Sequence, residues 1–233
     1  MIKKKLLAAL AIAPLVLLTA CGGETPTASP SPSASEKPLS LEECAPSTAT
    51  GHTPATVAQP SKPDSALPKK IIFSTNCGDI EITLNPKAPL TVTSISTLAN
   101  AGYFNNSTCH RLTTEGLYVL QCGDPTATGG GSPTGWSGYK DENLPAEAAN
   151  NYPEGTVAMA NSGPGTNGSQ FFLVYADTTL GANYTIWGTI TKGLDLVKKI
   201  ADIGAYQVQN NQTYYAGDGT PIQTVEILKA TAK

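Results

Sequence analysis

Charged residues, histidines and long apolar runs are all scarce in this sequence of 233 residues. Only 14% of the residues are charged, the formal net charge is −3, and there are two histidines. A nucleic-acid-binding domain needs a clustered basic face, and so weak a charge gives no such electrostatic footprint. We therefore expect no nucleic-acid partner.

The one long apolar run, Leu6 to Leu18, is too short for a transmembrane helix, which needs about 20 apolar residues. It follows three lysines, Lys3 to Lys5, in the manner of a secretory signal. The run leads into Leu18-Thr19-Ala20-Cys21, which resembles the lipobox of bacterial lipoproteins. We expect residues 1–20 to be a lipoprotein signal peptide and Cys21 to carry the lipid. The protein would then be anchored in the lipid bilayer of the cell membrane, on its extracytoplasmic face. The alternative is an ordinary signal peptide with a cysteine near its cleavage site.

Hydrophobic periodicity is missing from residue 22 to about residue 68, a stretch rich in Pro, Ser, Thr and Ala. Such a segment cannot bury enough apolar surface to offset the entropy lost on ordering. We expect residues 21–68 to be the lipidated cysteine and a disordered tether, and residues 69–233 to form one folded domain.

No C-x-x-C pair is present, and the expected domain contains a single histidine, so a metal site has little support. Outside the cytoplasm an even number of cysteines favours disulfides, and four cysteines permit three connectivities. Cys109 and Cys122 flank an expected hairpin, so we favour that pair and leave Cys44 with Cys77. Metal binding by these cysteines is the alternative.

Apolar periodicity predicts a loop-rich β domain with two helices. The helices are expected at 89–100, starting at a proline, and at 194–203, between two glycines. Strands are expected at 71–75, 80–84, 108–112, 117–122, 157–161, 170–175, 184–190 and 222–228. Short strands at regular spacing with two isolated helices indicate an antiparallel barrel or sandwich.

A polar amide and an aromatic ring share one strand face near residue 171. Side chains alternate along a strand, so Gln170 and Phe172 point the same way and Phe171 points to the other face. By the same rule Val119 shares a face with Gln121. An amide beside an aromatic ring indicates the edge of a pocket for something partly apolar. The alternative is a hairpin whose two phenylalanines are simply core.

Six short motifs also occur in a particular order. They are Cys109-His110-Arg111, Gln121-Cys122-Gly123-Asp124-Pro125, Asp141-Glu142-Asn143, Met159-Ala160-Asn161-Ser162-Gly163-Pro164, Thr166-Asn167-Gly168-Ser169-Gln170-Phe171-Phe172 and Trp187-Gly188. The series resembles that of the cyclophilins, a family of peptidyl-prolyl cis-trans isomerases, and covers about residues 70–228. The resemblance implies a mainly β fold: a closed eight-stranded antiparallel β-barrel capped by two α-helices. The substrate groove would lie on the outside of the barrel.

The resemblance also assigns roles to single residues. Arg111 matches the catalytic arginine, and Gln121 and Gln170 match the glutamines that orient the arginine and the substrate. The apolar pocket that receives proline is matched by Tyr118, Val119, Phe172 and Leu180. Ala160 and Asn161 match the segment whose main chain pairs with the residue before proline. Tyr184, which we also expect to contact the substrate, stands where a histidine is often found. The turn between Arg111 and Gln121 is two residues longer than in the best-known members.

The implied reaction needs no cofactor, metal, nucleophile or proton relay, because no bond is broken. Rotation of an X-Pro amide is opposed by a barrier of about 18–20 kcal/mol, since resonance is lost on twisting. Catalysis requires preferential binding of the twisted amide. As resonance fades, the prolyl nitrogen gains a lone pair, to which Arg111 can donate a hydrogen bond.

Three functions are to be weighed. We expect a monomeric isomerase that acts on proline-containing peptides and unfolded exported proteins. A non-catalytic proline-peptide-binding or chaperone lipoprotein with the same groove is the alternative. A solute-binding lipoprotein would need two α/β lobes, and the sequence lacks that pattern.

Overall fold

The computed structural model describes residues 40–233, which contain twelve strands and two helices. The expected signal peptide, Cys21 and the first part of the expected tether lie outside the described residues. The strands are β1 (Lys70–Thr75), β2 (Gly78–Leu84), β3 (Ser107–Thr108), β4 (Arg111–Thr113), β5 (Val119–Cys122), β6 (Thr156–Met159), β7 (Phe171–Val174), β8 (Ile186–Lys192), β9 (Ala205–Gln209), β10 (Gln212–Ala216), β11 (Asp218–Pro221) and β12 (Glu226–Ala232). Within this part of the chain, neither helix is both long and apolar enough to cross a membrane.

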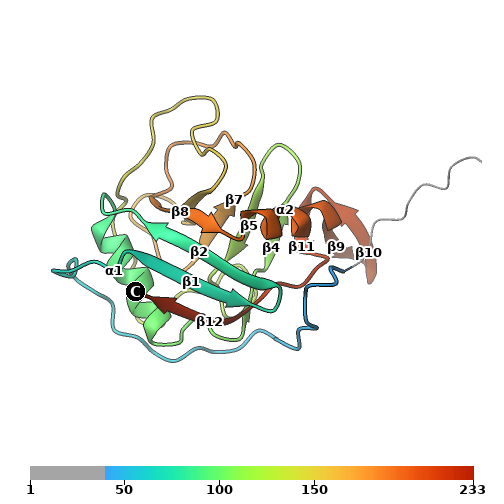
Figure 1. Ribbon diagram of the computed structural model, residues 1–233, viewed down its shortest axis with the longest axis horizontal. Helices are drawn as coiled ribbons and strands as arrows, with labels where there is room; N and C mark the ends of the chain where they lie inside the picture. The colour runs from blue at the N-terminus through green and yellow to red at the C-terminus, as the bar shows by residue number, and fades with distance from the viewer. Residues whose placement is uncertain (1–39) are drawn as a thin grey trace, which may run out of the picture. The chain divides into compact units, whose positions relative to one another are not determined.

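The two helices, α1 (Pro89–Asn100) and α2 (Leu194–Ile203), have the bounds expected from the sequence. Proline opens α1, where its missing N–H is not needed. The carboxylate of Glu142 accepts hydrogen bonds from the first free N–H groups of this helix, those of Leu90 at 3.2 Å and Thr91 at 2.9 Å. Figure 1 shows α1 beside β12 and α2 near β11.

All strand pairs are antiparallel, in the order β10-β9-β11-β4-β5-β7-β6-β8-β2-β1-β12-β3. The prediction of a closed eight-stranded barrel is therefore wrong, because the sheet has twelve strands and its hydrogen bonds do not close a ring. The reason lies in residues 107–113, which contain both β3 at the end of the order and β4 in its middle. Only Cys109 and His110 separate these two strands, so the chain itself joins the end of the sheet to β4.

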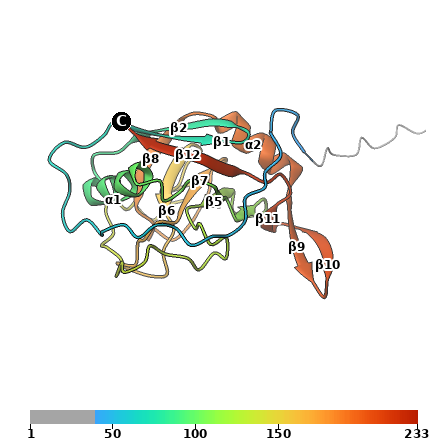
Figure 2. The same cartoon turned by 90° about the horizontal axis from the view of Figure 1, so that it is seen from below.

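Three strands, β9 to β11, were not expected, and the last strand starts four residues later than predicted. The β9–β10 hairpin turns at Asn210 and Asn211, whose φ angles are +51° and +60°. Two residues with positive φ form the turn type that suits a tight hairpin, so the Asn-Asn pair is a signal that the sequence prediction missed. In Figure 2 this hairpin projects away from the remaining strands.

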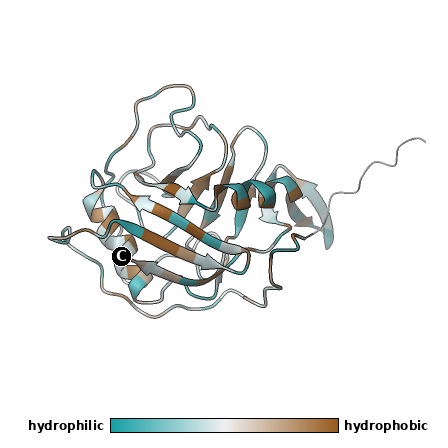
Figure 3. Ribbon diagram, viewed as in Figure 1, coloured by the Kyte–Doolittle hydropathy of each residue, from teal (hydrophilic) through white to brown (hydrophobic). Residues whose placement is uncertain are grey.

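The interior of the sheet holds a large cluster of buried apolar side chains. Phe171 lies at its centre, with its ring centroid 5.0 Å from that of Phe73 and 5.6 Å from that of Trp187. Figure 3 shows the apolar stretches on the strands around this interior. Phe172 points to the opposite face, as strand alternation predicts, and belongs to a second, smaller cluster with Val119, Tyr152, Ala158 and Val174.

Residues 40–68 have no helix or strand but are held against the domain, which corrects the expectation of a disordered tether up to residue 68. A disulfide joins Cys44 to Cys77, and the second disulfide joins Cys109 to Cys122, so both predicted pairs are confirmed. Along the segment, Trp136 Nε1 donates to the Val57 carbonyl at 2.8 Å and Gln59 Nε2 donates to the Gly138 carbonyl at 2.7 Å. These partners come from distant loops, so composition alone could not reveal them. We call residues 40–68 the strap.

Candidate active site

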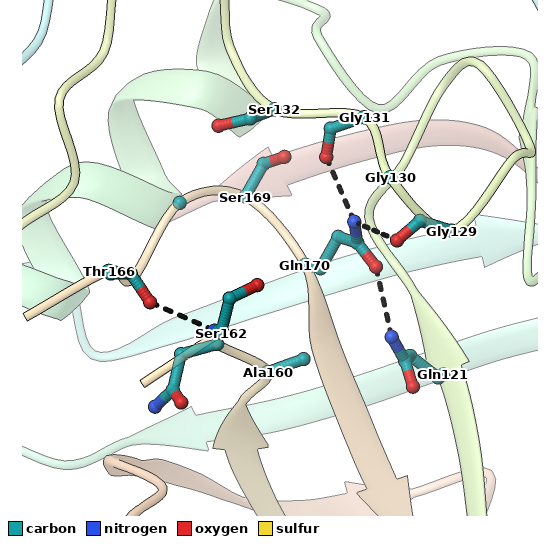
Figure 4. Close-up of a pocket in the computed structure, with 12 residues that line it drawn as sticks. Gln121, Gly129, Gly130, Gly131, Ser132, Ala160, Ser162, Thr166, Ser169 and Gln170 are labelled. Carbon is teal, nitrogen blue, oxygen red and sulfur yellow. Dashed lines mark hydrogen bonds between the residues drawn. The ribbon is translucent and has the colours of Figure 1, made fainter. Parts of the chain in front are cut away.

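A chain of side-chain hydrogen bonds links Arg111 on β4 to a glycine loop, residues 129–131. Arg111 Nη1 donates to Gln121 Oε1 at 3.2 Å, and Gln121 Nε2 donates to Gln170 Oε1 at 2.9 Å. Gln170 Nε2 then donates to the carbonyls of Gly129 and Gly131, both at 2.9 Å (Figure 4). The pairing of Arg111 with Gln121 and of Gln121 with Phe172 across β4, β5 and β7 places these residues in one row.

The donor and acceptor order of these side-chain hydrogen bonds is set at the glycine loop. Carbonyl oxygens only accept, so Gln170 must turn its amide N–H₂ group to Gly129 and Gly131 and its oxygen to Gln121. Gln121 must in turn present its own oxygen to Arg111. The glycine loop thereby fixes the orientation of both amides and keeps an acceptor against the guanidinium.

Asp124 holds the glycine loop in place. Its side chain is fully buried and accepts hydrogen bonds from the main-chain N–H groups of Thr126, Thr128, Gly129 and Gly131, at 2.8 to 3.1 Å. Burial by itself raises the pKa of this carboxyl, but the hydrogen bonds from Thr126 and Gly131 outweigh it and hold the pKa below its usual range. The charged carboxylate is thus the form that organises the loop.

Arg111 has a second partner, Asp218, which begins β11. Arg111 Nε donates to Asp218 Oδ1 at 2.8 Å and Nη2 donates to Oδ2 at 2.7 Å, a bidentate pair. The hydrogen bond that Arg111 donates to Asp218 raises the pKa of Arg111, and the same bond lowers the pKa of Asp218. The arginine is therefore held in its charged form and in one plane.

A pocket of about 170 Å³, lined mostly by apolar and aromatic side chains, opens beside Arg111. Its lining includes eight of the ten predicted site residues, all but Tyr118 and Gln170, and the full set is Arg111, Leu117, Val119, Gln121, Ala160, Asn161, Phe172, Leu180 and Tyr184. The ring of Tyr184 packs edge-to-face on that of Phe172, with the centroids 5.6 Å apart. This lining suits a small apolar ring with one polar edge.

The prediction that Tyr118 lines the proline pocket is wrong. The ring of Tyr118 packs against Tyr175, with the centroids 6.0 Å apart. Leu117 lines the pocket instead. Leu117 and Val119 are two residues apart, so strand alternation places them on one face and Tyr118 on the other. The alternation of Leu117 and Val119 could have been read from the sequence. The motif match chose Tyr118 instead, because the turn before it is longer here than in the best-known members.

The segment that follows β6 forms the opposite rim of the pocket. Ala160 N–H donates to the Gln170 carbonyl at 2.9 Å, and Asn161 Nδ2 donates to the Asn183 carbonyl at 2.9 Å. The side-chain oxygen of Asn161 accepts from the Gly163 N–H at 3.1 Å. The side chain of Asn161 is thus used to shape the rim, and its main chain has no backbone hydrogen-bond partner among residues 40–233.

Sequence reasoning brought together Arg111, Gln121, Gln170 and the pocket, but missed Asp218 and the role of Asp124. Asp218 lies 107 residues after Arg111, on a strand that was not expected. His110, next to Arg111, has both ring nitrogens buried without a hydrogen-bond partner in the described residues. Burial lowers the pKa of His110, which favours the neutral ring.

Comparisons with known proteins agree with this geometry. Residues 70–232 match the family model described as cyclophilin type peptidyl-prolyl cis-trans isomerase/CLD. The chain is 49% identical over 146 residues to a probable peptidyl-prolyl cis-trans isomerase B of Mycobacterium leprae, covering 57% of this chain and 48% of that protein. The probable peptidyl-prolyl cis-trans isomerase B of Mycobacterium tuberculosis is 43% identical over 189 residues, covering 75% of this chain and 55% of that protein. The chain thus spans about half the length of these curated relatives.

Among solved structures, the fold is similar to a cyclophilin type peptidyl-prolyl cis-trans isomerase of Cryptosporidium parvum, determined in the presence of the dipeptide Ala-Pro. The TM-score is 0.55 and the identity 25%, over 70% of this chain and 98% of that chain.

Proposed function

Because the chain belongs to the family of cyclophilin-type peptidyl-prolyl cis-trans isomerases, we propose that it catalyses rotation about X-Pro bonds in the pocket beside Arg111. The observation that carries this proposal is the guanidinium of Arg111, held in one orientation by Gln121 and Asp218 at the rim of an apolar pocket. The proline ring would enter the pocket between Val119, Phe172 and Leu180.

In this proposal Arg111 stabilises the twisted amide. Three of its five N–H groups are used by Asp218 and Gln121, which leaves two that can donate to substrate. One would meet the lone pair that develops on the prolyl nitrogen, and the other the neighbouring carbonyl oxygen. The bond to the prolyl nitrogen strengthens as the amide twists, because that nitrogen becomes a better acceptor, and this is the condition for a faster rate. The bond to the carbonyl oxygen positions the substrate.

The energetic demand is larger than one hydrogen bond. An acceleration of about 10⁵-fold needs roughly 7 kcal/mol. A charge-assisted hydrogen bond supplies about 1.5–3 kcal/mol. The remainder must come from positioning, in which the pocket holds the ring and the Asn161 main chain pairs with the residue before proline. The fixed arginine contributes by needing no reorganisation during the reaction.

The decisive test is cis/trans exchange of an Ala-Pro peptide followed by NMR, with the wild type, Arg111→Ala and Arg111→Lys side by side. We expect fast exchange with the wild type and a loss of at least about tenfold in both variants, since lysine keeps the charge but lacks the planar fork. If the wild type binds the peptide without accelerating exchange, the groove belongs to a proline-peptide-binding or chaperone module.

We further propose that the protein is lipid-anchored through Cys21 on the extracytoplasmic side of the cell membrane and acts on unfolded exported proteins. The basic and apolar residues before Cys21 support export, as do the two disulfides, which persist in oxidising compartments. The test is metabolic labelling with a radioactive fatty acid such as palmitate in a bacterial host. We expect labelled protein in the membrane fraction and no label in Cys21→Ser. Labelling that survives in Cys21→Ser would refute the anchor.

A further inference from the structure

We propose that a cleft between strand β9 and the Arg111–Asp218 pair binds the substrate chain that follows the proline, in extended form, along the free edge of β9. The proposal rests on the proposed function, because it names where the rest of that substrate lies. It assigns a purpose to the β9–β10 hairpin, which projects from the domain in Figure 2 and whose strand β9 lines a cleft together with Arg111 and Gln121.

The sheet forks at this cleft. The first half of β11 pairs with β4, Asp218 with Thr113 and Gly219 with Leu112. The second half leaves β4 and pairs with β9, Thr220 with Tyr206 and Pro221 with Ala205. Beyond Tyr206, β9 continues to Gln209 and is paired only with β10.

The free edge presents the main chain of Val208. The Ile222 N–H donates to the Gly204 carbonyl at 3.0 Å, so the main-chain groups of Gly204 point toward β11. Main-chain groups alternate between the two edges of a strand, so Tyr206 and Val208 point the same way as Gly204. Tyr206 is paired with β11, but no strand of the described chain pairs with Val208 on this edge. Val208 is also 60% exposed.

The cleft has a volume of about 710 Å³ and lies next to the proline pocket. His110, Arg111 and Gln121 form one wall and Tyr206 to Gln209 the other. Arg111 and Gln121 also line the proline pocket, so the two spaces adjoin at these two side chains.

The direction of the substrate follows from the opposite side of the pocket. There a second cleft, of about 160 Å³, shares Gln121, Ala160 and Asn161 with the proline pocket. In the proposed function the residue before proline pairs with Asn161, so the preceding chain runs to that side. The chain after the proline then leaves past Arg111 and enters the cleft at β9.

Pairing with a strand edge selects chain length and extended form rather than side chains. Main-chain N–H and C=O groups are common to every polypeptide, so the cleft suits unfolded proteins of varied sequence. Five residues beyond the proline extend about 16 Å and would reach along the free part of β9.

The test compares two peptides by NMR titration: one that ends one residue after Ala-Pro, and one that continues for five residues of alanine and threonine. We expect the wild type to bind the long peptide about fivefold more tightly, the effect of one net main-chain hydrogen bond. In Val208→Pro the ratio falls to about one, because proline removes the N–H that faces the cleft and leaves the β10 ladder intact. In Val208→Thr, which keeps the main-chain donor, the ratio stays near fivefold.

Equal affinities for the two peptides in the wild type, or a ratio that survives in Val208→Pro, would overturn the inference. A second measurement needs no variant: the Val208 amide hydrogen of the wild type should exchange more slowly with the long peptide bound, and not with the short one. An unprotected amide would also overturn the proposal. The affinity ratio tests the cleft alone, whereas the rate of cis/trans exchange of the short peptide tests the proposed catalysis, so the two failures are distinguishable.

Discussion

Arg111 is constrained from two sides, and the two partners act differently. Gln121 accepts one hydrogen bond and is itself fixed by Gln170, whereas Asp218 is a charged partner that takes two N–H groups and sets the plane. Both members of the ion pair are partly exposed, with 39% and 51% of their side-chain surface accessible. An exposed pair contributes little to folding stability. The value of Asp218 therefore lies in positioning Arg111.

Replacing Asp218 with asparagine should slow catalysis and leave the fold unchanged. Asparagine has one acceptor oxygen in place of two and no charge, so the bidentate pair is lost and the guanidinium gains freedom to rotate away from the pocket. We expect the exchange rate of a bound Ala-Pro peptide to fall by about three- to tenfold, with a much smaller change in peptide affinity. Asp202→Asn, an exposed carboxylate on α2, is the matched control. A wild-type rate in Asp218→Asn would show that Gln121 alone positions the arginine.

The glycine loop fixes the orientation of Arg111 through Gln170 and Gln121. Two adjacent glycines of the loop allow this role to be tested. A Cβ added at Gly131 would overlap Asp124 Oδ1, whereas one added at Gly130 would meet only Thr128 Oγ1, at 3.8 Å. Neither residue has a positive φ, so backbone strain does not distinguish them. We expect Gly131→Ala to displace the loop carbonyl that holds Gln170 and to lower the exchange rate at least about fivefold. Gly130→Ala should keep the wild-type rate, and equal rates in the two variants would contradict this role of the loop.

The same loop gives the protein a stability that depends on pH. The pKa of Asp124 is lower in the folded protein than in the unfolded chain, where it is about 3.9. The stabilisation is therefore fully present above the unfolded value and is lost as the pH falls through the folded value. In urea unfolding we expect Asp124→Asn to cost about 2–4 kcal/mol at pH 7 and distinctly less near pH 3. A cost that does not change with pH would mean that the carboxylate charge is not what holds the loop.

The elements show where sequence reasoning succeeded and where it stopped. Helices α1 and α2 were predictable because proline or glycine marks their ends and apolar residues recur at helical spacing. The row from Arg111 to Gln170 was predictable from motifs and from strand alternation. Hairpin β9–β10 was not expected, since its strands are polar and largely exposed and show no buried face. The bidentate bond to Asp218 depended on that hairpin region, so it could not be found before the fold was known.

The whole domain is held by two disulfides that have different relations to the site. Cys44–Cys77 ties the strap to the turn between β1 and β2 and encloses 33 positions of sequence. Cys109–Cys122 encloses 13, and its cysteines adjoin His110 and Gln121, next to the hydrogen-bond chain. Chain entropy alone predicts stabilisation of about 3–4 kcal/mol for the first and about 3 kcal/mol for the second.

Removing either disulfide should therefore lower stability, but only removal of Cys109–Cys122 should also lower activity. In the double variant Cys44→Ser/Cys77→Ser we expect a loss of about 3–4 kcal/mol in denaturant unfolding, with a wild-type exchange rate, because the strap does not line the pocket. In Cys109→Ser/Cys122→Ser we expect a similar loss of stability together with slower exchange, because β4 and β5 are then free to shift Arg111 against Gln121. Measuring both variants well below their unfolding midpoints separates the two effects. If the strap variant lost activity while still folded, the strap would be acting on the groove through the loop at Pro125, whose carbonyl accepts from the His52 N–H at 2.8 Å.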